Sequence, residues 1–106
     1  MSAFGDDGRD ARASAASEAA LEARVRSRRN LMIGVWAAGL MGLEDVSAYA
    51  RAVARSEADT PLDEDIFRKV SRDLADSGLT TSAAEVRTKM EEFLAVARAQ
   101  MDSGEI

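Results

Sequence analysis

The stretch that decides the fold is Leu31–Leu43, LMIGVWAAGLMGL, the longest apolar run of the chain. Its 13 residues are too few for a membrane span, which needs ~20. The run also lies too far from the start, behind too many acidic residues, to be a signal peptide. A helix through it is apolar on almost every side, which predicts the central helix of a bundle.

We expect this helix to begin between Ser17 and Leu21, to end near Leu40 and to stop at Gly42. Four apolar residues recur on one of its faces and are expected to point into the core: Leu21, Val25, Met32 and Trp36. Gly34 and Gly39 each cost roughly 1 kcal/mol relative to alanine inside a helix. We therefore expect a neighbouring backbone to approach closely at both glycines.

Two more helices are expected between residues 45 and 78. Asp45 can cap the first, which carries an inward stripe and fades near Ala58. Thr60 and Pro61 form a start signal for the next, which Gly78 closes. The expected inward residues are Val46, Tyr49, Ala50 and Val53 in the first helix and Leu62, Ile66, Val70 and Leu74 in the second.

The last expected helix opens with the capping box Ser82–Glu85. Its apolar residues follow the helical period: Val86, Met90, Phe93, Leu94, Ala97 and Met101. Four amphipathic helices joined by short turns pack as a bundle, because each must hide its apolar stripe against the others. The sequence thus predicts an all-α protein, with a four-helix bundle over residues 17–106.

The first 16 residues differ from the rest. Phe4 is their only bulky apolar side chain beyond the initial methionine, and Gly5 and Gly8 lie close to it. Such a segment buries too little surface to hold itself in place, although its alanine content favours helix. We interpret residues 1–16 as an arm that is flexible or conditionally helical.

Composition excludes most catalytic chemistry. The chain has 106 residues, no histidine and no cysteine, so the usual zinc ligands, thiolate nucleophiles and imidazole bases are absent. A net charge of −5 argues against a general nucleic-acid binder, which needs a basic surface. We expect no enzyme activity, no nucleic-acid partner, no membrane insertion and a monomer in the free state.

Two charged clusters have alternative interpretations. The acids Asp59 and Asp63–Asp65 could hold a divalent cation, but acids in a first helical turn also stabilise the helix dipole, which suffices here. A run of arginines, Arg24, Arg26, Arg28 and Arg29, could grip phosphates or a protein partner. On a helix these side chains spread over more than one face, so a solvated or internally paired surface is favoured. The aromatic residues Trp36, Tyr49, Phe67 and Phe93 are interpreted as core anchors.

Four segments together resemble the zeta subunit of alphaproteobacterial F-type ATP synthases. The segments are RSRRNLMIGVWAAGLMGL (26–43), AYARAV (48–53), DEDIFRKVSRDL (63–74) and EVRTKMEEFLAVARAQM (85–101). Their order and spacing match the family over about 75 residues. The resemblance implies a cytoplasmic ATPase inhibitor, peripheral to the inner membrane, whose partner is the soluble catalytic head of the synthase.

The family resemblance also implies how such a protein acts. Its arm enters a catalytic interface of the head and blocks rotation in the hydrolytic direction. On this basis the expected partner-binding residues are Phe4, Asp6, Arg9, Arg28 and Arg29. The bulky apolar positions of the family arm fall here on Ala11, Ala15 and Ala23, which predicts weak or lost inhibition.

Two alternatives to the inhibitor remain open at this stage. One is a non-inhibitory paralogue that uses the bundle as a protein-interaction module. The other is a module that binds ADP or ATP weakly, through the arginine run or a groove of the bundle. No resident cofactor, metal site or catalytic residue is expected.

Overall fold

The computed structural model describes residues 3–56 and 63–106, with side chains from Ala15 onward. These ranges contain four helices and no strand: α1 (Ala3–Met41), α2 (Val46–Ser56), α3 (Asp63–Asp76) and α4 (Ala83–Asp102). The predicted all-α, four-helix architecture is confirmed. None of the described helices is long and apolar enough to span a membrane.

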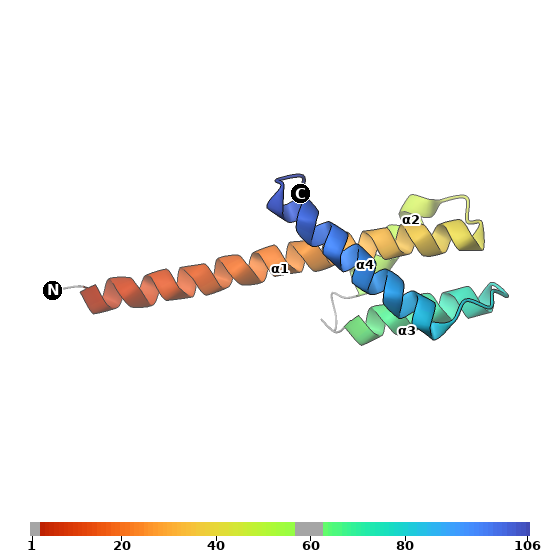
Figure 1. Ribbon diagram of the computed structural model, residues 1–106, viewed down its shortest axis with the longest axis horizontal. Helices are drawn as coiled ribbons and strands as arrows, with labels where there is room; N and C mark the ends of the chain where they lie inside the picture. The colour runs from red at the N-terminus through yellow and green to blue at the C-terminus, as the bar shows by residue number, and fades with distance from the viewer. Residues whose placement is uncertain (1–2, 57–62) are drawn as a thin grey trace.

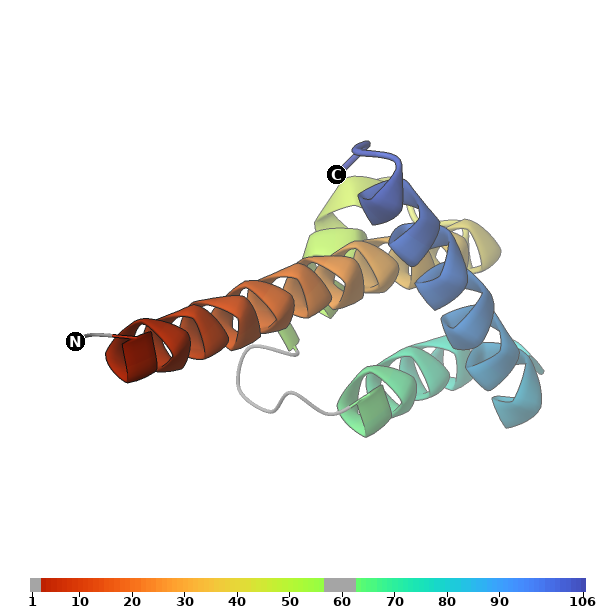
Figure 2. The ribbon, with the colours of Figure 1, turned by 60° about the vertical axis from the view of Figure 1, so that its left-hand side comes forward.

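Helix α1 dominates the shape of the molecule. It has 39 residues, and at 1.5 Å per residue it measures ~58 Å, close to the longest dimension of 66 Å. Its N-terminal part projects away from the other helices in both ribbon views (Figures 1 and 2). The radius of gyration of 17.2 Å therefore exceeds the ~13 Å typical of a compact chain of this length.

The start of α1 differs from our prediction, since the backbone is helical from Ala3 rather than from Ser17–Leu21. The physical reason is cooperativity: the bundle provides the helical nucleus, and an alanine-rich sequence extends it at little cost. The backbone of residues 3–16 is helical in the structure, and whether this helix depends on a partner stays a prediction. The division into residues 1–16 and 17–106 stays a prediction.

The predicted helix ends are confirmed. Gly42 follows α1 with φ of 67°, and Gly78 follows α3 with φ of 81°, a left-handed conformation that glycine adopts without a steric penalty. The amide of Leu43 donates to the carbonyl of Ala38 at 3.1 Å, and the amide of Leu79 donates to that of Leu74 at 3.1 Å. Both pairs have the spacing of a Schellman motif, which satisfies carbonyls at a helix end.

Two predicted helix starts are also confirmed. The Asp45 carboxylate accepts from the amide of Ala48 at 2.9 Å, and the Ser82 hydroxyl accepts from the amide of Glu85 at 3.1 Å. Helix α2 ends at Ser56. The expectations for Ala58, Asp59, Thr60, Pro61 and Leu62 fall outside the described residues.

The core forms where α2, α3 and α4 pack on the C-terminal half of α1. Its central members are Ile33, Ala37, Val53, Ile66, Val70, Leu74, Val86 and Met90, with Trp36, Tyr49, Phe67 and Phe93 packed partly buried against them. The stripes predicted for the three shorter helices therefore face the core. The aromatic residues are core anchors as expected, although each keeps some exposed surface.

The prediction of which face of α1 is buried is wrong. Leu21 is 44% exposed and only Val25 of the predicted four is fully buried; Met32 and Trp36 are half-buried. The buried face instead follows Val25, Arg29, Ile33 and Ala37 at intervals of four residues. Because residues 31–43 are apolar all round, their periodicity does not distinguish the core side.

Gly34 brings α1 and α2 into close contact. A Cβ atom added there would lie 2.7 Å from the Cα atom of Ala50, so any side chain would push the helices apart. The same expectation is wrong for Gly39, where an added Cβ meets nothing within 4 Å. The small residue at position 34 thus sets the distance between the two helices.

Candidate partner-binding site

The predicted site residues occupy two parts of α1. Phe4, Asp6 and Arg9 lie in the projecting N-terminal part, where the backbone is helical and side chains are outside the described set. Arg28 and Arg29 lie about 30 Å away along the same helix, at the edge of the bundle. The structure therefore does not bring the two groups together.

The arginine run spreads around the helix as the spacing predicted. Arg24 and Arg28 are exposed, Arg26 is half-buried, and Arg29 is buried. The four guanidinium groups therefore do not converge on one point from the same face. Binding of ADP or ATP by this run remains a prediction.

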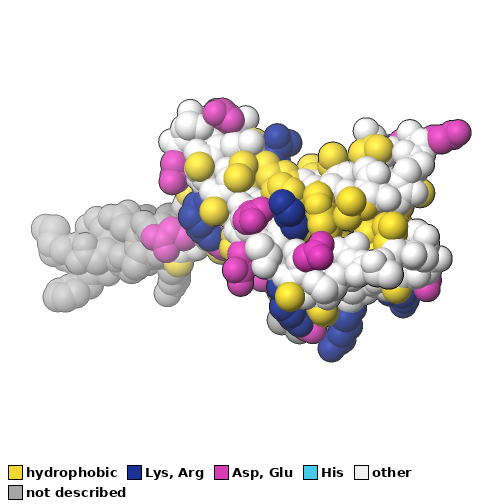
Figure 3. All heavy atoms as spheres, turned by 45° about the vertical axis from the view of Figure 1, so that its right-hand side comes forward, with side chains coloured by type: hydrophobic (Ala, Val, Ile, Leu, Met, Phe, Trp, Pro, Cys, Tyr) yellow, Lys and Arg dark blue, Asp and Glu magenta, His cyan; other side chains and the backbone are white. Residues whose placement is uncertain are grey.

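Arg28 borders an apolar groove between α1 and α4. Its Nε donates to the side-chain oxygen of Gln100 at 2.9 Å, which joins the two helices. The groove, about 430 Å³ in volume, is lined by Arg28, Leu31, Met32, Val35, Trp36 and Phe93. Figure 3 shows hydrophobic side chains gathered across one face of the bundle, with charged side chains at their borders.

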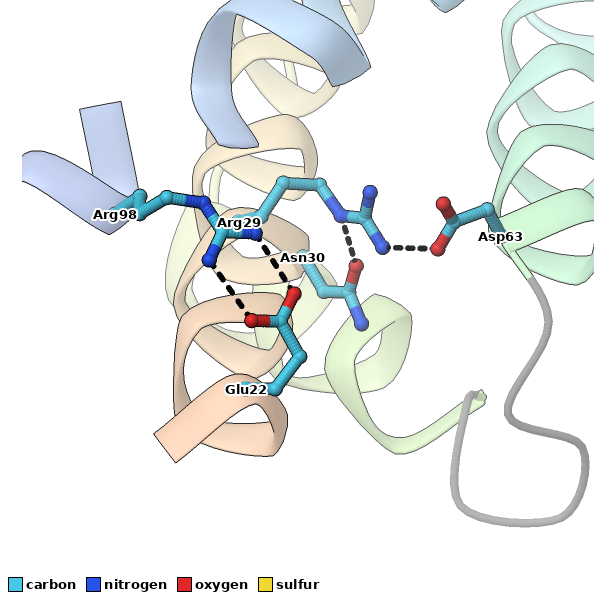
Figure 4. Close-up of polar contacts among 5 residues, drawn as sticks. All are labelled: Glu22, Arg29, Asn30, Asp63 and Arg98. Carbon is cyan, nitrogen blue, oxygen red and sulfur yellow. Dashed lines mark hydrogen bonds and ion pairs between the residues drawn. The ribbon is translucent and has the colours of Figure 1, made fainter. Parts of the chain in front are cut away.

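Arg29 is the member of the arginine run that lies inside the bundle. It is 1% exposed, and its Nε donates to the side-chain oxygen of Asn30 at 2.7 Å. Its Nη2 donates to Asp63 at 2.7 Å, which ties the first turn of α3 to α1 (Figure 4). A buried charge is tolerated only when it is paired and hydrogen-bonded, so this cluster holds Arg29 inside the chain. In this conformation Arg29 is not on the surface that a partner meets, and its predicted partner role stays a prediction.

A second ion pair fixes the place where α1 leaves the bundle. Arg98 of α4 donates to both carboxylate oxygens of Glu22, at 2.9 and 2.8 Å (Figure 4). These hydrogen bonds lower the pKa of the Glu22 carboxyl below its ordinary value and raise the pKa of Arg98. Residues 15–20, which precede Glu22, are all exposed.

The acids at the start of α3 pair with cations of other helices. Asp63 contacts Arg29, and Glu64 contacts Arg87 of α4 at 3.2 Å. The Arg87 guanidinium also lies 3.8 Å from the centre of the Phe67 ring, a cation–π contact. Among the described residues no group of three or more acidic side chains is placed to hold a metal ion.

Tyr49 links α2 to α3 through a small polar cluster. Its hydroxyl donates to Asp73 at 2.7 Å, and Lys69 contacts the same carboxylate at 3.1 Å. Burial raises the pKa of the Tyr49 hydroxyl above its ordinary value, and the hydrogen bond to Asp73 adds to the shift. A phenol that stays protonated is suited to fixing a helix contact rather than to proton transfer.

Sequence reasoning missed Glu22, Asn30, Gln100 and Arg98 as members of these contacts. One signal was present for Arg29, which sits midway between Val25 and Ile33 at intervals of four and so shares their buried face. The partners on α4 lie more than 70 positions away in the chain, and no local pattern identifies them.

The fold and its surface define a class: an all-α four-helix bundle with a projecting N-terminal helix. A comparison with known families narrows this class. The family described as ATPase inhibitor subunit zeta matches residues 1–100, and the chain belongs to that family. Searches of the curated proteins and of the solved structures each gave no match.

Membership of this family defines a regulatory role. The family is named for an inhibitor subunit, which agrees with the expectation drawn from the four sequence segments. It associates the protein with the ATP synthase.

Proposed function

We propose that the chain slows ATP hydrolysis by the synthase by inserting the N-terminal part of α1 into a catalytic interface of the soluble head. The observation that carries this proposal is the single helix from Ala3 to Met41, whose first part projects beyond the bundle. A helix already formed loses less conformational entropy on binding than a disordered segment does. Phe4, Asp6 and Arg9 are the proposed contacts of its tip.

Inhibition of this kind requires contacts that differ between rotary states. A bound segment shifts an equilibrium only by its difference in affinity for the two states. An arm that enters a catalytic interface meets this condition when the interface changes shape during rotation. The bundle cannot follow the arm into a narrow interface, so it stays outside and limits the depth of insertion.

We further propose that inhibition is weak. Ala15 and Ala23 are exposed small side chains, and Ala11 lies on the same helix, whereas the family resemblance places bulky anchors at all three. Loss of a large anchor commonly costs 1 kcal/mol or more at an interface hot spot, and ~1.4 kcal/mol is a tenfold change in affinity. Three such losses lower the affinity by two to three powers of ten, about 3–4 kcal/mol in all.

The direct test is to measure ATP hydrolysis by synthase from the same source with and without the full chain. A chain that lacks residues 1–20 is the control, because the Glu22 carboxylate that accepts hydrogen bonds from Arg98 of α4 is kept. A variant that carries Ala15→Leu and Ala23→Leu is expected to inhibit at ~100-fold lower concentration than the natural chain. If neither the natural chain nor this variant slows hydrolysis, the inhibitor proposal is wrong.

A further inference from the structure

The groove between α1 and α4 leaves apolar surface uncovered on the bundle. Val35 is 50% exposed, while Leu31, Met32, Trp36 and Phe93 are each half-buried along its walls. Val96, one turn after Phe93 and one turn before Gln100, is 45% exposed. Contiguous exposed apolar surface of this kind marks a contact site more often than isolated exposed residues do.

The charge around the groove is positive at one end. Arg28 is the single charged residue of its lining, and within the described residues it makes no ion pair with a carboxylate. Arg24, one turn earlier on α1 and exposed, also makes no ion pair with a carboxylate within the described residues. Lys89, at the other end of the α4 wall, is paired with Glu92 at 3.1 Å. In a chain of net charge −5, Arg28 in the lining and Arg24 one turn away make this end of the groove locally positive.

We propose that this groove docks an acidic amphipathic helix of the synthase head, as a second contact beside the arm. This inference rests on the proposed function and names a further surface for it. The groove is open to solvent and lies between two helices, a shape into which the side-chain ridge of a third helix fits. Apolar side chains at positions i, i+3 or i+4, and i+7 of that helix fill the groove. Its carboxylates face Arg24 and Arg28.

A second copy of this chain fits the groove less well. A symmetric dimer brings the same patch of both copies together. Since the groove lining contains an arginine and no carboxylate, such a dimer places like charges near each other and leaves both uncompensated. An acidic helix from another protein compensates them.

The two proposed contacts act together, because the groove adds binding free energy to an arm with few anchors. Once the bundle is docked, insertion of the arm becomes an intramolecular step with a high effective concentration. The groove therefore supplies binding that the alanines of the arm lack. Because binding is shared between the groove and the arm, variants of the groove are expected to weaken binding even though they leave the arm unchanged.

The test measures binding of the full chain to the purified soluble head, with two groove variants, Arg28→Glu and Val35→Asp. The matched controls are Arg51→Glu, an exposed arginine of α2, and Leu43→Asp, an exposed apolar residue after α1; neither lines the groove. We expect each groove variant to raise Kd about tenfold or more and each control to change it less than about threefold. Circular dichroism verifies that all four variants are folded.

Trp36 supplies a direct readout, because it is the only tryptophan of the chain and lines the groove. Hydroxytryptophan at this position can be excited apart from tryptophan of the head. Docking is expected to shift its emission to shorter wavelength, and the Arg28→Glu variant is expected to need about tenfold more head for the same shift.

The outcomes separate this inference from the proposed function. If the natural chain does not bind the head at all, the proposed function fails and the groove proposal fails with it. If the natural chain binds and the groove variants bind equally well, the groove proposal alone is wrong. If the free chain sediments as a dimer that Val35→Asp dissociates, a second copy covers the groove and the proposal is also wrong.

Discussion

Helix α1 contains two regions, residues 3–20 and residues 25–41, and different forces keep each of them helical. The second region carries buried side chains from Val25 to Ala38 and packs against α2, α3 and α4. In the first region every described side chain, from Ala15 to Ala20, is exposed. Tertiary packing stabilises the former, whereas intrinsic propensity and continuity with the bundle stabilise the latter. One helix can therefore combine a rigid anchor with an end left exposed for binding.

The largest expected effect comes from the packed region. Ile33→Ala removes a fully buried side chain from the centre of the core, which should lower the free energy of unfolding by about 2–5 kcal/mol. Leu40→Ala, at a position 45% exposed on the same helix, is the control and should change it by less than about 1 kcal/mol. Urea unfolding of both variants measures the difference, and equal losses would contradict the assigned core face.

The two glycines of α1 should respond to alanine with opposite signs. Gly34→Ala places a Cβ atom 2.7 Å from the Ala50 backbone and should cost about 1–3 kcal/mol of stability. Gly39→Ala meets nothing within 4 Å and should stabilise the protein by about 0.5–1 kcal/mol, because alanine favours helix. Thermal unfolding of the pair checks this, and a stabilising Gly34→Ala would mean that α1 and α2 are farther apart than described.

A glycine substitution in the exposed region should weaken the helix there and leave the global stability of the protein unchanged. Ala19→Gly weakens the helix there by about 1 kcal/mol, but residue 19 is exposed and contributes little to the core. Amide hydrogen exchange should become faster for residues 3–20 and stay unchanged for residues 25–41. A matching loss of global stability would show that the two regions unfold as one unit.

The smallest expected effect concerns the boundary between the regions, the Glu22–Arg98 ion pair. Because the folded-state pKa of Glu22 is lowered from 4.5, the pair stabilises the folded state above that pH. The contribution is lost as the pH falls through the lower, folded-state value. Carboxyl chemical shifts of Glu22 followed by NMR should report the lowered pKa, and Arg98→Gln should return it toward 4.5. An unchanged pKa in Arg98→Gln would exclude the pair as its cause.

Most of the fold could be predicted from the sequence because its signals are local. Gly42, Gly78 and Ser82 act on backbone groups within a few residues, and the stripes of α2, α3 and α4 are clear. The core face of α1 could not be predicted, since its apolar run lacks a polar side. The buried positions also include a charged residue, Arg29, which interrupts the apolar pattern of that face.

The candidate site was predicted less completely than the fold. The arginine run was recognised, and its spread around the helix was expected. Arg29 faces inward, where it pairs with Asp63. Arg28 borders the groove, where it lies with Phe93 and bonds Gln100. These partners come from other helices, so only the assembled bundle distinguishes Arg28 from Arg29.

The close contact of Gly34 with Ala50 is one of the contacts that orient α1 relative to the other helices. The helix extends roughly 46 Å from Gly34 to Ala3 at 1.5 Å per residue, so it behaves as a lever pivoting on this contact. A tilt of about 10° at the pivot displaces the tip of the lever by roughly 8 Å over that length. Packing at Gly34 thus affects the position of residues that lie several turns away, and a substitution in the bundle can displace an arm whose own sequence is intact.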